Sequence, residues 1–273
     1  MHARELLRRF GYRPKKRLGQ NFLADSNAAA RIAQLVLAAG AARVLEIGAG
    51  TGALTQALLE TGASVTALEL DPDMMRVLGS RDDLNGATLV QADALEFDYA
   101  GFAAGKPWTL TGNLPYHIAT ALILRFIEMR GGPQTLVVMM QKDVVDRLRA
   151  KPGTRAYGSL SVAVQYAMNV ERAFTLSPRA FYPQPKVDSS VVVLTRRDRP
   201  AVTVADEARF WQVVRGAFAY RRKTLANSLS LALHLERAVI SEALRDLGYD
   251  TEIRGEQLAI GDFARIADAL PAG

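Results

Sequence analysis

Residues 43–52 read Arg-Val-Leu-Glu-Ile-Gly-Ala-Gly-Thr-Gly. The run 43–47 has the length and the aliphatic content of a buried strand, and residues 53–60 continue with apolar side chains at helical spacing. A glycine-rich turn between a strand and a helix lets the backbone approach a ligand closely and points helix N–H groups at it. The stretch predicts an α/β domain with a ligand at this turn.

Strand and helix patterns alternate along the chain around this turn. Further strands are expected at 64–70, 88–91, 108–111 and 134–140, and helices at 27–37, 53–60, 119–129 and 142–150, with another starting at Pro72. Apolar segments follow at 160–170 and 191–194. This alternation predicts a doubly wound, Rossmann-like, mainly parallel α/β sheet with its ligand across the carboxyl ends of the strands.

The pattern changes after Val193. Residues 196–200 form a charged segment that ends in proline, and beyond it only helical spacing is present, at 210–218, 222–233, 237–247 and 260–270. We therefore expect two domains: residues 1–197 as the ligand-binding domain with a basic N-terminal arm, and residues 198–273 as a small, all-helical C-terminal domain.

The composition excludes several kinds of site. The 273 residues include no cysteine, which rules out disulfides, thiolate nucleophiles and cysteine-ligated metals. The three histidines, His2, His117 and His234, lack metal-ligand spacing, so we expect no metal. We expect a cytoplasmic protein because the sequence has neither a run of about 18 apolar residues nor a secretory signal pattern.

Positive charge is concentrated at the N-terminus. Residues 1–17 hold seven arginines and lysines against Glu5 alone, which equals the net charge of +6 of the whole chain. A concentrated basic segment attracts polyanions, and phosphate backbones are common ones. The segment favours a nucleic acid as partner, the alternative being the solvated end of a helix.

Three acidic residues stand at the ends of successive predicted strands: Glu46, Glu69 and Asp93. The glycine turn alone also matches the dinucleotide pattern, with Glu69 near the place of a ribose-binding acid. Glu46, however, precedes the first glycine by two residues and would repel a pyrophosphate, whereas it suits a cofactor that carries an ammonium and a sulfonium.

These observations favour S-adenosylmethionine as the cofactor. Glu69 is expected to bind the ribose hydroxyls and Asp93 the adenine amino group. The backbone of the turn would be held open by its three glycines, Gly48, Gly50 and Gly52. For each acid, the alternative is a solvated strand end or a helix cap.

Residues 113–116, Asn-Leu-Pro-Tyr, follow the fourth predicted strand and form the most specific motif. The side-chain carbonyl of Asn113 and the backbone carbonyl of Leu114 could accept hydrogen bonds from an adenine amine and stabilise the charge that develops on it during methyl transfer. Pro115 would fix the turn, and Tyr116 would stack on the base. The alternative is an ordinary capped turn before a helix.

The order of these motifs resembles that of the ribosomal RNA adenine N6,N6-dimethyltransferases. The resemblance covers nearly the whole chain from about residue 14 and is carried by the stretches 18–23, 46–52, 68–71, 91–94, 113–116, 157–161, 181–189 and 221–225. It implies dimethylation of two adjacent adenosines near the 3′ end of small-subunit (16S) ribosomal RNA, within an immature 30S particle. We expect a monomer because nothing in the sequence indicates an obligate dimer.

The resemblance also implies residue roles. Gln20, Asn21 and Leu23 would close over the methionine end of the cofactor, Ala94 would join Asp93 in binding it, and Phe181 would line the pocket of the target base. The expected phosphate contacts of the RNA are the basic residues Arg13, Lys15, Lys16, Arg17, Arg221, Arg222 and Lys223. For the last three, a solvated helix face is an equally good interpretation.

Three alternatives stay open at this point. A dimethyltransferase of the erythromycin-resistance type, which acts on large-subunit RNA, has a nearly identical catalytic domain. The protein could instead act mainly as a binding factor in ribosome assembly. A dinucleotide-dependent oxidoreductase would fit the glycine turn but leaves residues 113–116 without a purpose.

Overall fold

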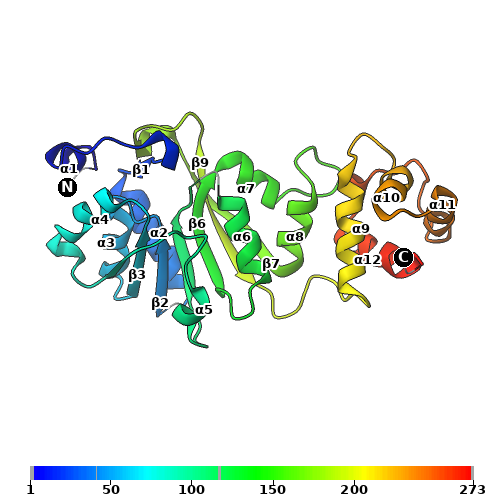
Figure 1. Ribbon diagram of the computed structural model, residues 1–273, viewed down its shortest axis with the longest axis horizontal. Coiled ribbons are helices and arrows are strands. Elements are labelled where there is room, and N and C mark those ends of the chain that lie inside the picture. Colours follow the sequence, from blue (N-terminus) through cyan, green and yellow to red (C-terminus); the bar gives the residue numbers. More distant parts are fainter. Residues whose placement is uncertain (1–2, 41, 116–117, 272–273) are drawn as a thin grey trace. The chain divides into compact units, whose positions relative to one another are not determined.

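The computed structural model in Figure 1 describes residues 3–40, 42–115 and 118–271. The chain divides into two compact units: Met1–Val145 with Asn169–Arg196, and Asp146–Met168 with Arg197–Gly273. Our expected division placed residues 146–168 in the first domain. They lie in the second unit because Tyr157, Val162 and Tyr166 pack in its core. That the two parts are separate domains with a boundary near residue 197 stays a prediction.

A seven-stranded sheet forms the centre of the first unit, in the order β4-β3-β2-β5-β6-β9-β7. Its strands are β2 (Arg43–Ile47), β3 (Ser64–Glu69), β4 (Thr88–Gln91), β5 (Thr109–Asn113), β6 (Thr135–Gln141), β7 (Met168–Leu176) and β9 (Ser189–Arg196). The pairs β2–β3, β3–β4, β2–β5 and β5–β6 are parallel, and β9 is antiparallel to β6. The predicted doubly wound, mainly parallel sheet is confirmed.

Helices join the parallel strands. The helices of this part of the chain are α1 (Ala3–Arg9), α2 (Ser26–Ala38), α3 (Ala53–Glu60), α4 (Pro72–Gly79), α5 (Tyr99–Ala103), α6 (Ala119–Glu128) and α7 (Lys142–Leu148), with 3-10 turns η1 (Lys16–Leu18), η2 (Asp82–Leu84) and η3 (Pro178–Ala180). The chain runs outward from β2 through β3 to β4 and then returns to β5 on the other side of β2. The strand order therefore reverses between β2 and β5, where open α/β sheets bind their ligands.

Local sequence explains where these helices begin. Asp71 caps α4 by accepting a hydrogen bond from the backbone N–H of Asp73, and Pro72 stands in the first turn, where its missing N–H costs nothing. Asp25 caps α2 in the same way through the N–H of Ala28. The buried residues of α2 and α3 then join those of the sheet, such as Val44, Val65 and Val137, in the main core of the unit.

Two N-terminal features have no counterpart in the predicted elements. Residues 3–9 form α1, whose Leu6 and Leu7 pack with Met74 and Val77 of α4, so the basic arm is docked through an apolar face. Further on, the short strand β1 (Phe22–Leu23) pairs antiparallel with β8 (Phe181–Tyr182).

The second unit is built from helices. They are α8 (Ser159–Ala167), α9 (Glu207–Ala219), α10 (Leu225–Leu233), α11 (Arg237–Asp246) and α12 (Ile260–Ala269), with the 3-10 turn η4 (Gly255–Gln257). Phe210, Leu229, Ile240 and Phe263 are fully buried in its core. The helices expected beyond residue 200 are present. Among the described residues, we find no helix with the length and apolar character needed to span a membrane.

Candidate active site

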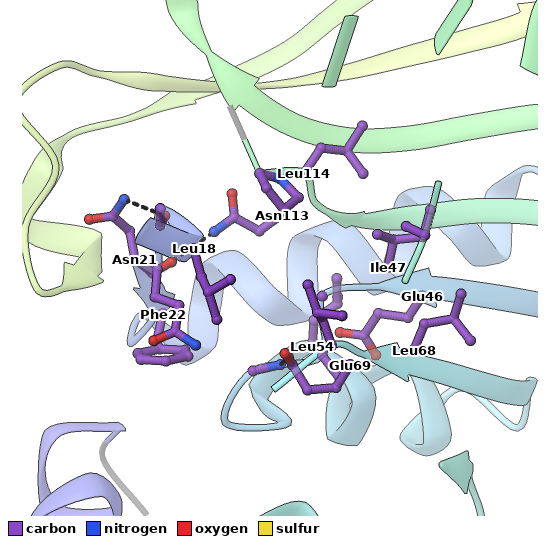
Figure 2. A pocket seen from close by; sticks show the side chains of 18 of the residues that line it. Leu18, Asn21, Phe22, Glu46, Ile47, Leu54, Leu68, Glu69, Asn113 and Leu114 are labelled. Atoms are coloured by element: carbon purple, nitrogen blue, oxygen red, sulfur yellow. Dashed lines mark hydrogen bonds between the residues drawn. The ribbon is translucent and has the colours of Figure 1, made fainter. Parts of the chain in front are cut away.

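A pocket lies at the carboxyl ends of β2, β3 and β5, beside the reversal of strand order (Figure 2). The side chains of Glu46, Glu69 and Asn113 line it from the ends of these three strands (Figure 2). The glycine turn 48–51, the segment 18–23 and residues 92–95 also line the pocket. Most of the expected cofactor-binding residues thus meet in one cavity, as the parallel sheet predicts.

The glycine turn follows β2 and is held by backbone hydrogen bonds. The N–H groups of Gly48 and Ala49 donate to the carbonyl of Leu68 at 2.9 and 3.0 Å. Gly50 has a φ of +56°, and a Cβ there would lie 2.8 Å from Cδ1 of Phe22. Only glycine satisfies both the left-handed backbone and this close approach. Gly52, also left-handed at φ +79°, leads into α3.

Glu46 is a buried carboxyl group beside the turn, only 1% exposed. The hydroxyl of Thr55 donates to its Oε2 at 2.6 Å. Burial raises the pKa of Glu46 to about 7, the hydrogen bond from Thr55 opposes this rise, and the nearby charge of Glu69 adds to it. A cationic ligand group next to Glu46 would favour its ionised form.

Glu69 connects the glycine turn to α4. Its Oε2 accepts from the N–H of Gly50 at 2.8 Å, and its Oε1 accepts from the N–H of Asp71 at 2.9 Å. Burial raises the pKa of Glu69, while these backbone hydrogen bonds oppose the rise. An ionised carboxylate can accept about four hydrogen bonds, so capacity remains for hydroxyl groups of a ligand.

Asp93 and Ala94 follow β4 and line the same pocket. Oδ1 of Asp93 accepts from the N–H of Leu95 at 2.8 Å, which fixes the orientation of the carboxylate. The carboxylate is a hydrogen-bond acceptor, which suits an exocyclic amino group. Its position at the end of a third strand agrees with the expected pattern of one acid per strand end.

Asn113 ends β5, and the two polar atoms of its side-chain amide differ in their environment. Its Nδ2 donates to the backbone carbonyl of Asn21 at 2.8 Å. Its Oδ1 is buried with no hydrogen-bond partner among the described residues. A buried acceptor without a donor costs about 1–3 kcal/mol, so this oxygen is suited to accept a hydrogen bond from an N–H or O–H group of a ligand.

The turn after Asn113 is fixed on both sides. The N–H of Leu114 donates to the carbonyl of Met139 at 3.0 Å, and the carbonyl of Pro115 accepts from the N–H groups of Ile118 and Ala119 at the start of α6. Just before the motif, a Cβ at Gly112 would collide with the backbone carbonyl of Ile47. Glycine at 112 lets β5 approach β2 here, a requirement that no sequence pattern indicated.

Two aromatic residues were expected at the target base. Tyr116, together with His117, lies outside the described residues. Phe181 pairs with Leu23 across β1 and β8 and is 2% exposed, within the core of the first unit. Leu23 lines the pocket, whereas the ring of Phe181 is not among its lining residues. The role of Phe181 at the base stays a prediction.

Gln20 and Asn21 lie along the pocket but use their polar groups within the protein. The side chain of Gln20 donates to Asp71 at 3.0 Å and accepts from Tyr12 and from the backbone N–H of Lys15. Nδ2 of Asn21 donates to the carbonyl of Gly19 at 3.1 Å. Tyr12 and Asp71 had not been assigned to the site, because their partners lie far away in the sequence.

The predicted RNA contacts of the N-terminal arm divide by environment. Nζ of Lys15 lies 2.7 Å from both Asp71 and Asp73, so protein carboxylates already neutralise its charge. Arg13 and Arg17 are exposed. The side chain of Lys16 is not described.

In the second unit, residues 221–223 are exposed in the turn between α9 and α10. The predicted helix start at Arg222 is wrong, since α10 begins at Leu225 after Thr224 as N-cap. The guanidinium of Arg221 donates to the carbonyls of Arg155 and Tyr157 at 3.0 and 3.1 Å. Arg222 and Lys223 are exposed cations beside it.

Comparison with known proteins identifies the family. The sequence model described as "Ribosomal RNA adenine dimethylase" matches residues 11–270. The chain belongs to this family. Among curated members, "Ribosomal RNA small subunit methyltransferase A" of Hahella chejuensis is 44% identical, with 94% of this chain and 93% of the relative covered. The protein of the same name from Bacillus mycoides is 39% identical, with 98% and 95% covered.

Solved structures of the dimethylase fold agree with this assignment. A 23S rRNA methyltransferase, ErmE, superposes with a TM-score of 0.72 at 25% identity, covering 92% of this chain and 99% of that one. A dimethyladenosine transferase from Plasmodium falciparum gives 0.72 at 24% identity, covering 90% and 95%, and supports the fold. The protein is therefore an S-adenosylmethionine-dependent methyltransferase, and the oxidoreductase alternative is excluded.

The pocket of this dimethylase suits S-adenosylmethionine on chemical grounds. The buried carboxyl groups of Glu46 and Glu69 complement a cationic ligand with hydroxyl groups, and Oδ1 of Asn113, to which no described residue donates, can accept a further hydrogen bond. No group of three or more histidine, aspartate or glutamate side chains that could hold a metal ion occurs in the described parts of the chain.

Proposed function

We propose that the protein dimethylates the N6 amines of two adjacent adenosines near the 3′ end of small-subunit ribosomal RNA. The observation that carries the proposal is the buried Oδ1 of Asn113 at the end of β5, an acceptor to which none of the described residues donates. The names of its curated relatives support the small-subunit RNA as substrate, at 39–44% identity, over the large-subunit alternative.

Asn113 and Leu114 are proposed to activate the amine. The lone pair of an adenine amine is delocalised into the ring, which makes the nitrogen a poor nucleophile. Oδ1 of Asn113 and the carbonyl of Leu114 would accept its two N–H bonds, favour a tetrahedral nitrogen and stabilise the developing positive charge. No general base is needed before transfer, because the methylated amine becomes acidic. A monomethylated amine offers one N–H fewer, so the second transfer relies on one of the two acceptors.

The acids and the glycine turn are proposed to hold the cofactor. S-adenosylmethionine supplies an electrophilic methyl group when bound. Glu69 would accept from the ribose hydroxyls and Asp93 from the adenine amino group, while Glu46 would face the cationic part. The absence of a side chain at Gly50 leaves room for the ring of Phe22, which lines the same pocket.

The exposed cations are proposed to hold phosphates of the RNA. Arg13 and Arg17 in the arm and Arg222 and Lys223 in the second unit are exposed, whereas Lys15 is paired with two aspartates. The target adenine must leave its stack to enter the pocket, at a cost of a few kcal/mol. We propose that the substrate is an immature 30S particle in the cytoplasm and that the protein acts as a monomer.

The decisive experiment incubates the pure protein with radiolabelled S-adenosylmethionine and with immature or mature small subunits. Digestion of the RNA to nucleosides should yield labelled N6,N6-dimethyladenosine from the small-subunit RNA. Asn113→Ala should lose methyl transfer while it still binds the cofactor in calorimetry. Label in large-subunit RNA, or undiminished transfer by Asn113→Ala, would contradict the proposal.

A further inference from the structure

Asp71 is a buried carboxylate outside the residues assigned to the site, and it is 1% exposed. Besides capping α4 through Asp73, it lies within hydrogen-bond distance of three side-chain donors of the N-terminal segment. The hydroxyl of Tyr12 lies 2.6 Å and Nε2 of Gln20 3.0 Å from its Oδ2, and Nζ of Lys15 lies 2.7 Å from its Oδ1. A carboxylate with this many donors is fully satisfied.

The three donors also bind one another. Oε1 of Gln20 accepts from the backbone N–H of Lys15 at 2.7 Å and lies 2.6 Å from the hydroxyl of Tyr12. That hydroxyl has one proton, so it donates either to Gln20 or to Asp71. Burial alone would raise the pKa of Asp71, but the hydrogen bonds from Lys15, Tyr12 and Gln20 lower it to about 2. Asp71 is therefore ionised at neutral pH.

This cluster fixes the middle of a segment that runs beside the pocket. We call residues 12–23 the strap. Its N-terminal end continues from α1, which packs on α4, and its C-terminal end is β1, which pairs with β8. Between these two anchors, the side-chain hydrogen bonds to Asp71 attach the strap to the start of α4, just after β3.

The strap reaches the catalytic amide directly. Residues 18–23 line the pocket, and the carbonyl of Asn21 accepts the hydrogen bond from Nδ2 of Asn113. This bond decides which end of the amide faces the pocket, since a carbonyl oxygen turned toward Asn21 would oppose another acceptor. The orientation of Asn113 thus depends on where the strap holds Asn21.

We propose that Asp71 is a positioning residue for methyl transfer. By holding Tyr12, Lys15 and Gln20 it keeps the strap in place, so that the carbonyl of Asn21 turns Oδ1 of Asn113 toward the substrate amine. The backbone N–H of Asp71 also donates to Oε1 of Glu69 at 2.9 Å. Asp71 therefore contacts both the strap and Glu69, and both line the pocket. The catalytic part of this inference rests on the proposed function, whereas the attachment of the strap does not.

Trypsin tests the attachment without any methyl transfer. Asp71→Asn removes the charge but keeps a good N-cap for α4. Cleavage after Lys15, Lys16 and Arg17, identified by mass spectrometry, should become about tenfold faster. Removal of a hydrogen bond to a charged group is expected to increase the population of the detached strap by about this factor. Asp73→Asn is the matched control, because Asp73 contacts Lys15 but neither Tyr12 nor Gln20. It should be cleaved at nearly the wild-type rate.

Kinetics at saturating cofactor test the positioning. Asp71→Asn and Tyr12→Phe should each lower kcat, Asp71→Asn by about tenfold, and the double variant should be no slower than Asp71→Asn. If Asp71 only stabilised α4, the fold-losses of kcat in the two single variants would multiply in the double variant. Thermal unfolding of each variant reports whether it is folded.

The outcomes separate this inference from the proposed function. Unchanged cleavage of Asp71→Asn, multiplicative losses of kcat, or equal effects of Asp71→Asn and Asp73→Asn would overturn the inference. A wild-type protein without methyl transfer would overturn the proposed function, and the cleavage experiment would still decide whether Asp71 holds the strap.

Discussion

The amide nitrogen of Asn113 donates a 2.8 Å hydrogen bond to the backbone carbonyl of Asn21, a residue 92 positions away in the sequence. The contact joins the end of β5 to the N-terminal segment and leaves Oδ1 of Asn113 buried without a hydrogen-bond partner among the described residues. One carboxamide thus has a donor end that is used within the protein and an acceptor end that no described residue uses, which the proposed function assigns to the substrate amine.

Asn113→Asp tests this division of the amide. The variant keeps two acceptor oxygens for the substrate but faces the carbonyl of Asn21 with an acceptor in place of a donor. We expect a loss of about 1–3 kcal/mol in the free energy of unfolding and a lower kcat. Protonation of the new carboxyl at low pH should restore part of the stability. Chemical denaturation between pH 5 and 8 measures this, and a pH-independent loss would contradict it.

Glu46 makes the stability of the free protein depend on pH. Burial raises its pKa from the ordinary 4.5 to about 7 in the folded protein. Between these values the folded state keeps a proton that the unfolded chain has released, so stability falls as the pH rises from about 4.5 to 7. Glu46→Gln should therefore raise the melting temperature at pH 8 by at least about 2 °C and leave it nearly unchanged at pH 4.5.

Thermal scans without cofactor provide the measurement, with Glu69→Gln as the comparison because the charge of Glu69 acts on Glu46. The two curves, wild type and Glu46→Gln, should converge toward acid. A wild-type protein that melts at the same temperature as Glu46→Gln at pH 8, or above it, would contradict the raised pKa of Glu46.

Gly50→Ala should weaken cofactor binding, an effect that the strain of a left-handed backbone at this position does not by itself explain. Gly50 and Gly62 are both left-handed, at φ +56° and +80°, so alanine costs about 1–2 kcal/mol at either position. The new Cβ at Gly50 would meet Phe22, whereas at Gly62 no described residue other than its two chain neighbours lies within 4 Å of it. Calorimetric titration with S-adenosylmethionine should show weaker binding for Gly50→Ala alone. Equal affinities of the two variants would refute the role of this close approach.

Arg222→Ala and Lys223→Ala should weaken RNA binding through loss of phosphate contacts. The slope of log affinity against log salt should fall by about 1 for each removed contact. Lys106→Ala, which removes an exposed charge from the turn before β5, is the matched control and should leave the slope unchanged. Filter binding at several salt concentrations measures this slope for each variant and for the control. Arg221→Ala should in addition lower stability, because its guanidinium holds the carbonyls of Arg155 and Tyr157.

Much of the architecture could be predicted from periodicity and glycine placement. The strand at 43–47, the helix at 53–60 and the parallel order that follows are local patterns, and they bring Glu46, Glu69 and Asn113 to one edge by the geometry of a parallel sheet. The apolar segment at 160–170 was ambiguous, because a helix ends at Ala167 and a strand begins at Met168 without a break in hydrophobicity.

What the sequence alone determined was the class of sheet, the family and which residue types stand at each strand end, because these depend on neighbours along the chain. The tertiary structure decided the tie between Asp71 and the strap, the burial of Phe181, the ion pairs of Lys15 and the orientation of Asn113. Each of these joins side chains that are separated by tens of residues. Their partners are chosen by packing and by the need to satisfy buried polar groups, which no local pattern records.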